Sequence, residues 1–220
     1  MLYVELRNTR PRLLLYDWDN TLVDGWAAIA GALNATFTAF DKPLWTVEET
    51  RARVRVALKE SFPVLFGDRW TEARDVFYAA FNADHLLHLR AMPGAEHALE
   101  AGQPWPQGIV SNKAGSFLRL EVAHLRWNGY FGAIVGAGDA VADKPDPAPI
   151  YLALEKMGHS AGRDVWYLGD TALDMKAAKA AGVTAVLVGM ADHDGGVEHA
   201  SPDIHFTDAH DLAACLHGLR

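Results

Sequence analysis

The 220-residue sequence has one cysteine, no long apolar run and no excess of basic residues. Because Cys215 has no second thiol in the chain, an internal disulfide cannot form, and we expect a reducing, cytoplasmic location. The apolar runs are too short to cross a bilayer, and the first residues lack a signal-peptide pattern, so no membrane association is expected. The net charge of −8, without a basic stripe, argues against nucleic acid as a partner.

What the chain does have is a series of short apolar runs with helical patterns between the later ones. Each run ends in glycine or a polar residue, as buried strands do. The runs lie at 13–17, 108–112, 132–136, 165–170 and 184–189. This alternation predicts an α/β fold with a parallel-sheet, Rossmann-like core covered on both faces. Pro106 cannot donate to a sheet, so the second strand is expected to begin no earlier than Gly108.

Residues 23–92 break the alternation. Three helical patterns follow one another there, at 26–40, 46–62 and 71–89, and Thr46 with Glu49 forms a capping-box pattern at the start of the second. A segment of about seventy residues is too long for an ordinary crossover connection. We therefore predict a helical cap domain over 23–92, inserted after the first strand of a discontinuous core made of 1–22 and 93–220. The alternative is that these helices form one face of a single domain.

Polar residues that can carry chemistry follow the strands in order. They are Asp17, Asp19 and Thr21 in "DWDNT", Ser111 in "VSNK", Lys144 in "DKPDP", and Asp170 and Asp174 in "LGDTALD". In a parallel sheet, the ligand site lies beyond the carboxyl ends of the strands, so these motifs are expected to meet there. Their order and spacing resemble the haloacid dehalogenase-like hydrolase superfamily, specifically its capped phosphatases similar to phosphoglycolate phosphatase. The resemblance runs from about residue 12 to residue 217.

The residues themselves indicate a metal-assisted reaction. A carboxylate can attack phosphorus if a cation reduces the repulsion between the two anions. Asp17, Asp19 and Asp170 would repel one another as an isolated cluster, and a hard divalent cation with oxygen ligands, Mg²⁺, would relieve that repulsion. We therefore predict a magnesium-dependent phosphomonoester hydrolase, a monomer or homodimer, acting on a small phosphorylated metabolite. The resemblance implies a phosphoglycolate-like compound as the candidate.

The resemblance implies roles for the acids. Asp17 would be both nucleophile and metal ligand. Asp19 would give its main-chain carbonyl to the metal, and its side chain would be the general acid and base. Asp170 would be the direct metal ligand of the last motif, while Asp174 would hold a metal-bound water or orient Lys144.

The remaining predicted site residues would bind the phosphoryl group. Ser111 would donate from its hydroxyl, and Lys144 would supply a positive charge. Main-chain amides around Trp18 and Asn20 would complete the cradle. Thr21 would tie the loop together by a hydrogen bond, and Asn112 is placed with the substrate-binding residues. Taken singly, each motif is also interpretable as a turn or a helix cap, but four together at successive strand ends favour catalysis.

Substrate specificity is expected to come from the second helix of the insert. It carries four basic residues, of which Arg53, Arg55 and Lys59 are the predicted substrate-binding ones, and Arg51, Arg55 and Lys59 would share one face. Either these charges are solvated and paired with Glu48 or Glu60, or one of them binds a second anionic group of the substrate. The second interpretation would favour small phosphorylated acids over neutral sugar phosphates.

Two other functions remain open at this point. A phosphomutase of the same fold would need matched cap residues that hold a sugar. A non-catalytic phosphate-binding regulatory protein would have no reason to concentrate repelling acids. The His- and Asp-rich segment 192–211 is expected to be a solvated polar edge rather than a second metal site.

Overall fold

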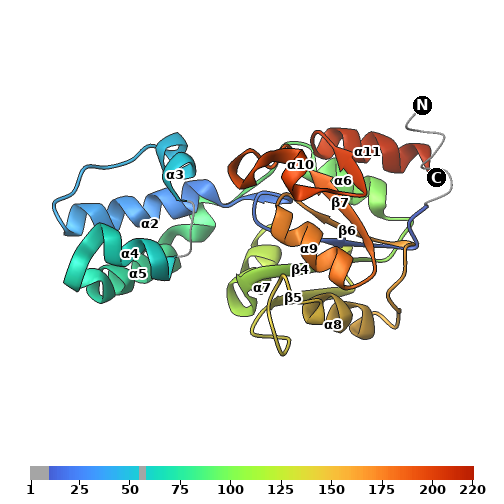
Figure 1. Ribbon diagram of the computed structural model, residues 1–220, viewed down its shortest axis with the longest axis horizontal. Coiled ribbons are helices and arrows are strands. Elements are labelled where there is room, and N and C mark those ends of the chain that lie inside the picture. Colours follow the sequence, from blue (N-terminus) through green and yellow to red (C-terminus); the bar gives the residue numbers. More distant parts are fainter. Residues whose placement is uncertain (1–9, 55–57) are drawn as a thin grey trace. The chain divides into compact units, whose positions relative to one another are not determined.

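The computed structural model describes residues 10–54 and 58–220, and the chain divides into two compact units. The first unit comprises the residues up to Val23 and from Ala91 onward, and the second runs from Asp24 to Arg90 (Figure 1). Where the chain passes between them, β2 (Val23–Asp24) and β3 (Arg90–Ala91) form a two-stranded sheet. Each unit has its own hydrophobic core.

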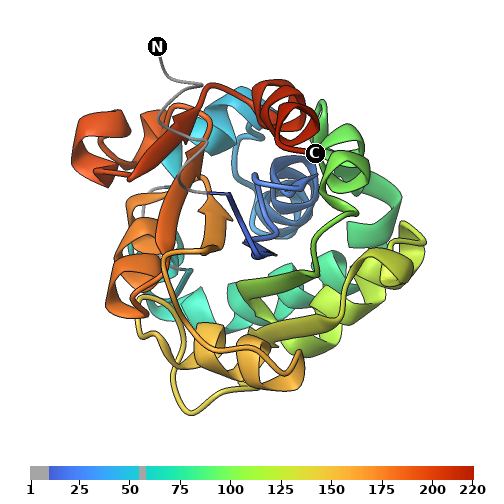
Figure 2. The ribbon, with the colours of Figure 1, turned by 90° about the vertical axis from the view of Figure 1, so that its right-hand side faces the viewer.

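A six-stranded parallel sheet forms the centre of the first unit (Figure 2). Its strands are β1 (Leu13–Tyr16), β4 (Gln107–Ala114), β5 (Ala133–Ala137), β6 (Val165–Gly169), β7 (Thr184–Val188) and β8 (Ile204–Phe206). They are ordered β5-β4-β1-β6-β7-β8, so that β1 is hydrogen-bonded to β4 on one side and to β6 on the other. The predicted parallel α/β core is confirmed.

Strand β4 begins at Gln107, one residue earlier than predicted. Proline lacks a donor but keeps its carbonyl, and the Leu14 amide donates to the Pro106 carbonyl at 3.0 Å. The buried Gln107 side chain then accepts a hydrogen bond from the Tyr16 hydroxyl (3.0 Å) and donates to the Leu99 carbonyl (3.1 Å). These contacts satisfy a polar side chain at the buried start of the strand.

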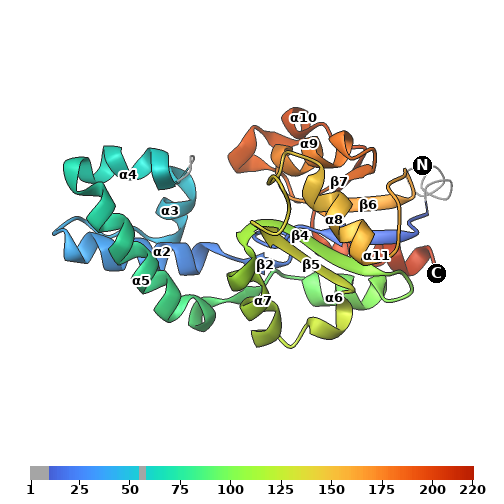
Figure 3. The ribbon, with the colours of Figure 1, turned by 90° about the horizontal axis from the view of Figure 1, so that it is seen from below.

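Helices cover both faces of the sheet, as Figures 2 and 3 show. On one face lie α8 (Ala148–Lys156) and α9 (Ala172–Ala180), which share a core cluster with Leu13 and Leu15 of β1. On the other lie α6 (Ala95–Gly102), α7 (Gly115–His124) and α11 (Ala209–Gly218); the short α10 (Gly196–Ala200) precedes β8. Leu13 and Leu15 face the same side of the sheet because side chains alternate between the two faces of a strand. Burial of each leucine stabilises the fold by about 1.5–3 kcal/mol.

The described residues of the second unit form four α-helices around an aromatic core. They are α2 (Trp26–Ala39), α3 (Val47–Arg53), α4 (Leu58–Phe66) and α5 (Trp70–His88). Phe62 lies at its centre, with its ring centroid 5.0 Å from that of Phe66 and 5.6 Å from that of Phe77. The predicted capping box is confirmed, because the Glu49 amide donates to the Thr46 hydroxyl (3.1 Å) and the Thr46 amide to the Glu49 carboxylate (2.9 Å).

The single helix predicted over 46–62 is wrong. Helix α3 ends at Arg53, and the described part of α4 runs from Leu58 to Phe66. The residue after α3, Val54, has an extended backbone (ψ 96°) and packs on the aromatic cluster. This packing outweighs the weak helix propensity of valine, so the helix ends before it. Arg51 and Lys59 therefore do not share the face of one continuous helix.

Over residues 10–54 and 58–220, the helices are too short or too polar to cross a membrane.

Candidate active site

Residues at the carboxyl ends of three central strands line a cavity of about 460 Å³ in the first unit. Strand β1 leads into Asp17, β4 carries Ser111, and β6 leads into Asp170. The lining residues are Asp17, Asp19, Asn20, Ser111, Asn112, Lys113, Lys144, Asp170, Thr171, Leu173, Asp174 and Asp194. The structure thus brings together residues from all four predicted motifs.

Three buried carboxylates meet in this cavity. Asp17, Asp170 and Asp174 each place an oxygen within 4.8 Å of the other two. Burial raises the pKa of Asp17 to about 6, with the Lys144 charge opposing that rise and the Asp174 charge adding to it. Burial, together with the charges of Asp174 and Asp17, raises the pKa of Asp170 well above its usual range. The cluster is therefore electrostatically unfavourable unless a cation is near.

Lys144 supplies one such positive charge. Its ammonium donates to Asp17 Oδ1 and to Asp174 Oδ1, both at 2.7 Å, and its side chain is only 3% exposed. Burial lowers the pKa of Lys144, but the charges of Asp17 and Asp174 outweigh it, so that the pKa lies well above its ordinary value. Lys144 is held charged beside the predicted nucleophile.

Asp174 is committed to partners in the protein at both oxygens. Besides Lys144 at Oδ1, its Oδ2 accepts from the Thr171 hydroxyl at 2.6 Å and the Thr171 amide at 3.1 Å. The buried Tyr167 hydroxyl lies 3.3 Å from Oδ1. Gly169 makes this approach to β6 possible, because any Cβ there would collide with the Asp174 side chain. Of the two predicted roles for Asp174, orienting Lys144 fits these contacts.

In the loop after β1, two predicted binding residues already have partners in the protein. The Asn20 backbone is left-handed (φ 62°), and its amide donates to the Val23 carbonyl at 2.7 Å; the cradle of main-chain amides around Trp18 and Asn20 stays a prediction. The Trp18 side chain is fully buried, and its Nε1 donates to Glu121 at 2.6 Å. Only the main chain of Trp18 remains a candidate for substrate contact. Asp19, by contrast, lines the cavity with a side chain 33% exposed.

Thr21 and Asn112 hold other site residues. The Thr21 side chain is buried, and its hydroxyl donates to Asp170 Oδ1 at 3.2 Å, so it supports a predicted metal ligand rather than reaching a substrate. The Asn112 amide side chain forms a pair of 2.9 Å hydrogen bonds with the main chain of Lys144, which fixes the segment that bears that lysine. Ser111 lines the cavity, and its hydroxyl accepts from the Lys113 amide at 3.2 Å.

Sequence reasoning missed Lys113 and Glu121. The Lys113 ammonium donates to Asp19 Oδ1 at 2.8 Å and to both Glu121 oxygens at 2.8 and 2.6 Å. Glu121 lies on α7 with a side chain 1% exposed, between two buried residues of that helix, Leu118 and Val122. A glutamate on the apolar face of a helix was the signal in the sequence, because a buried carboxylate requires a partner.

The predicted specificity residues lie in the helical unit. The Arg53 guanidinium is paired, but with Glu49 (3.0 Å) rather than with Glu48 or Glu60, and it lies 4.8 Å from the centroid of the Trp45 ring. Arg55 lies outside the described residues, as does the side chain of Lys59.

The expectation of a solvated edge over 192–211 fails at Asp194. This carboxylate lines the cavity and accepts a hydrogen bond from the Ala172 amide at 2.6 Å, at the start of α9. A negative charge at a helix N-terminus is favourable, so Asp194 stabilises the helix that carries Asp174.

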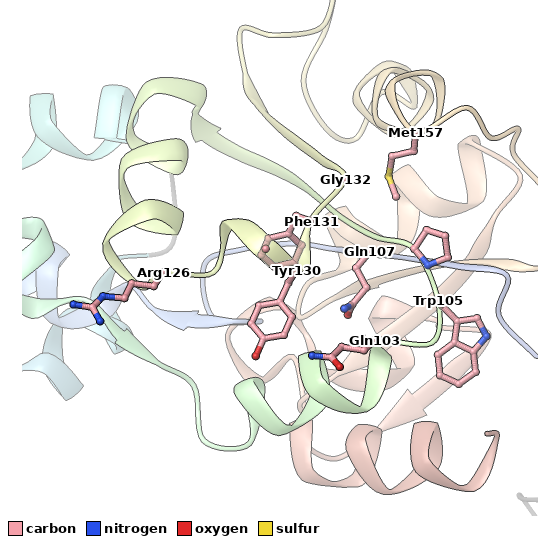
Figure 4. Close-up of a pocket in the computed structure, with 10 residues that line it drawn as sticks. Gln103, Trp105, Gln107, Arg126, Tyr130, Phe131, Gly132 and Met157 are labelled. Atoms are coloured by element: carbon pink, nitrogen blue, oxygen red, sulfur yellow. The ribbon is translucent and has the colours of Figure 1, made fainter.

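A second cavity, of about 750 Å³, lies away from this chemistry. It is found at the amino ends of β4 and β5, because its lining includes Gln107, the first residue of β4, and Gly132, which immediately precedes β5. Figure 4 shows Trp105, Tyr130 and Met157 around it. Because ligands of parallel sheets bind beyond the carboxyl ends of the strands, the smaller cavity is the candidate active site.

The acidic cluster fits a divalent cation. Asp17 and Asp170 offer carboxylate oxygens, the ligands that hard cations prefer, and their raised pKa values record how strongly these charges need compensation. The hydrogen bond from the Thr21 hydroxyl orients the Asp170 carboxylate, as outer-shell partners do for metal ligands.

Comparisons with known proteins identify the family and agree with the fold. The model of the haloacid dehalogenase-like hydrolase family matches residues 14–188. A phosphoglycolate phosphatase of Pectobacterium atrosepticum is 30% identical over 89% of this chain and 88% of its own, and one of Xanthomonas campestris is 31% identical over 80% and 82%. A haloacid dehalogenase-like hydrolase structure from Streptococcus pneumoniae superposes with a TM-score of 0.80 at 21% identity, covering 93% of this chain and 97% of its own. The chain therefore belongs to the haloacid dehalogenase-like hydrolase family.

Proposed function

We propose that this chain, a phosphatase of the haloacid dehalogenase-like family, hydrolyses a small phosphorylated acid through an aspartyl-phosphate on Asp17. The observation that carries the proposal is the Asp17 carboxylate itself. It lies in a cavity, buried, with its pKa raised to about 6 and with Lys144 2.7 Å away. A carboxylate placed in this way is poorly solvated and has a cation beside it to offset the charge of an incoming phosphate.

The residues divide the reaction between them. An oxygen of Asp17 attacks phosphorus while the ester bond breaks, and Asp19 gives a proton to the departing oxygen. Asp19 then takes a proton from the water that attacks the aspartyl-phosphate, which frees Asp17 and inorganic phosphate. Ser111 and Lys144 hold the phosphoryl oxygens, and Asp174 and Asn112 keep Lys144 in place. A bound Mg²⁺, held by Asp17, Asp170 and the Asp19 carbonyl, would neutralise charge on the phosphoryl group.

The substrate class is drawn from the relatives. Several proteins similar to this chain are phosphoglycolate phosphatases, which supports a short phosphorylated carboxylic acid as substrate. In this proposal the helical unit, 24–90, acts as a cap that selects the substrate. One of its basic residues in the segment 51–59 would recognise the carboxylate.

A phosphate-release assay tests the proposal. Wild type and Asp17→Asn are compared on phosphoglycolate and on a neutral sugar phosphate, with Mg²⁺ and with excess chelator, and the sugar products are examined for phosphate transfer. We expect release by wild type alone, only with Mg²⁺, and faster from phosphoglycolate. Transfer to a second sugar position would instead identify a phosphomutase, and binding of phosphoglycolate without turnover would identify a regulatory protein.

A further inference from the structure

The side chain of Asp19 is held by a charge network that the proposed reaction has not yet used. Lys113 lies between two carboxylates, Asp19 on the cavity side and Glu121 on α7. The exposed fractions of the side chains are 33% for Asp19, 10% for Lys113 and 1% for Glu121. The network therefore runs from the cavity into the interior of the first unit.

The buried end of this network is fixed. The Trp18 indole donates to Glu121 Oε2 at 2.6 Å, and Trp18 itself is fully buried with its ring 5.9 Å from that of Trp127 in an edge-on arrangement. Because Trp18 stands between Asp17 and Asp19 in the sequence, the same residue links the nucleophile loop to the position of Glu121.

Lys113 is fully occupied within the network. An ammonium group has three donors, and Asp19 Oδ1 and the two Glu121 oxygens account for three hydrogen bonds. Burial lowers the pKa of Lys113, but the charges of Asp19 and Glu121 outweigh it, and the pKa lies above its ordinary value. A phosphate group would have to displace one of these bonds to reach Lys113. Lys144 differs, because the hydrogen bonds to Asp17 and Asp174 use only two of its three donors.

We propose that Lys113, anchored by Glu121, is a positioning residue that holds Asp19 by Oδ1, so that Oδ2 carries the proton of the reaction. This inference rests on the proposed function. In the first step, the Asp17–phosphorus bond forms, the ester P–O bond breaks, and the proton on Oδ2 passes to the leaving oxygen. In the second, water attacks phosphorus, its proton passes to Oδ2, and the Asp17–phosphorus bond breaks. Without Lys113, the Asp19 side chain could rotate away from the leaving oxygen of the first step and from the attacking water of the second.

Leaving-group dependence separates positioning from structure. An alkyl ester such as phosphoglycolate needs a proton on its leaving oxygen, whereas 2,4-dinitrophenyl phosphate leaves as a stable anion and does not. The value of kcat/KM covers only the steps up to departure of the leaving group. A loss confined to the alkyl ester is therefore a loss of proton donation, while a damaged fold would slow both esters.

The experiment compares wild type, Lys113→Met, the double variant Lys113→Met/Glu121→Gln and a control, Lys156→Met. The double variant removes both charges of the Lys113–Glu121 pair, and the carbonyl oxygen of the introduced glutamine can still accept from Trp18. We therefore expect it to fold even if Lys113→Met alone does not. Lys156 is an exposed lysine at the end of α8. Thermal unfolding of each variant is followed in parallel.

We expect the double variant to lose about 10²-fold or more in kcat/KM on phosphoglycolate and little on the dinitrophenyl ester, with the control unchanged. Equal losses on both esters, or wild-type activity of the double variant on phosphoglycolate, would overturn the role of Lys113 while leaving the phosphatase proposal intact. A wild type that hydrolyses neither ester in Mg²⁺ would overturn the proposed function and this inference with it.

Discussion

The two units of the molecule place their charges in opposite ways. The first buries five ionisable side chains of the site, namely Asp17, Glu121, Lys144, Asp170 and Asp174. Its ion pairs join distant parts of the sequence, such as Lys144 with Asp17 and Arg163 with Asp203. In the described part of the helical unit, the ion pairs are exposed, and most join residues within four positions, such as Arg69 with Glu72.

The difference concerns what the charges of each unit contribute to stability. A buried charge costs free energy, and a protein keeps a cluster of them where a reaction needs poorly solvated groups. Exposed local pairs contribute little, at most about 1 kcal/mol each, so the stability of the helical unit comes from its aromatic core. Among the described residues, the buried carboxylates thus belong to the first unit, whereas the helical unit is held together by apolar and aromatic contacts.

The strongest test of this contrast is Asp17→Asn. Turnover should be abolished, because a neutral amide does not attack phosphorus and binds a divalent cation more weakly than a carboxylate does. The fold should persist because a buried, poorly solvated charge is removed. Phosphate release and circular dichroism give the two readings. A folded Asn variant with substantial activity would rule out the covalent route.

Asp19→Asn should have the next largest effect. Proton transfer contributes about 10²–10⁴-fold, and both formation and breakdown of the aspartyl-phosphate should slow by amounts in that range. Mg²⁺ affinity, measured by calorimetry, should survive because the proposed ligand is the main-chain carbonyl. A collapse of Mg²⁺ affinity would mean that the Asp19 side chain is itself a ligand.

Phe62→Ala tests the helical unit alone. Removing this buried ring should cost about 3–5 kcal/mol, seen as lost hydrogen-exchange protection in α2–α5. Mg²⁺ affinity of the first unit should not change. Val64→Ala, at a neighbouring side chain that is 86% exposed, is the control and should be near neutral. Equal effects of the two variants would show that the aromatic core does not stabilise this unit.

Arg53→Met should change little. Its guanidinium is occupied by Glu49 and Trp45, so kcat/KM on phosphoglycolate and on a neutral sugar phosphate should fall together and slightly. Lys59→Met is the informative comparison, because a loss there confined to phosphoglycolate would assign carboxylate recognition to the cap. A selective loss in Arg53→Met would show that the Glu49 pair opens to receive substrate.

The smallest effect is expected for Asp203→Asn. Burial raises the pKa of Asp203, but Arg163 and the Ala185 amide outweigh it, so the folded-state pKa lies below its usual value. A lowered pKa stabilises the fold above the unfolded-state pKa, and this stabilisation is lost as the pH falls through about 4 and below. The variant should therefore flatten the acid limb of stability against pH, measured by urea unfolding. An unchanged acid limb would mean that solvent screens the pair completely.

The sequence predicted the site where geometry follows from topology. Parallel strands bring their carboxyl ends to one edge, so Asp17, Ser111 and Asp170 were placed together without knowing any distance. The Lys113–Glu121 pair was not predicted because it depends on which face of α7 packs toward β4. The helix break at Val54 was not predicted because helix propensity alone does not decide its conformation, whereas packing on the aromatic core does. Asp194 was missed because the turn that carries it back to α9 has no periodic pattern.

The central place of β1 in the sheet has a consequence for synthesis on the ribosome. Its two hydrogen-bonding partners are residues 107–109 and 165–168, so the apolar "LLLY" segment emerges long before either neighbour exists. At about 5–20 residues per second, that interval is on the order of 10 s, during which a bare strand is prone to self-association. Arg12 and Asp17 flank the segment directly. Charged residues beside an apolar segment oppose its self-association, so Asp17 and Arg12 are placed where they would protect β1 until its neighbours are made.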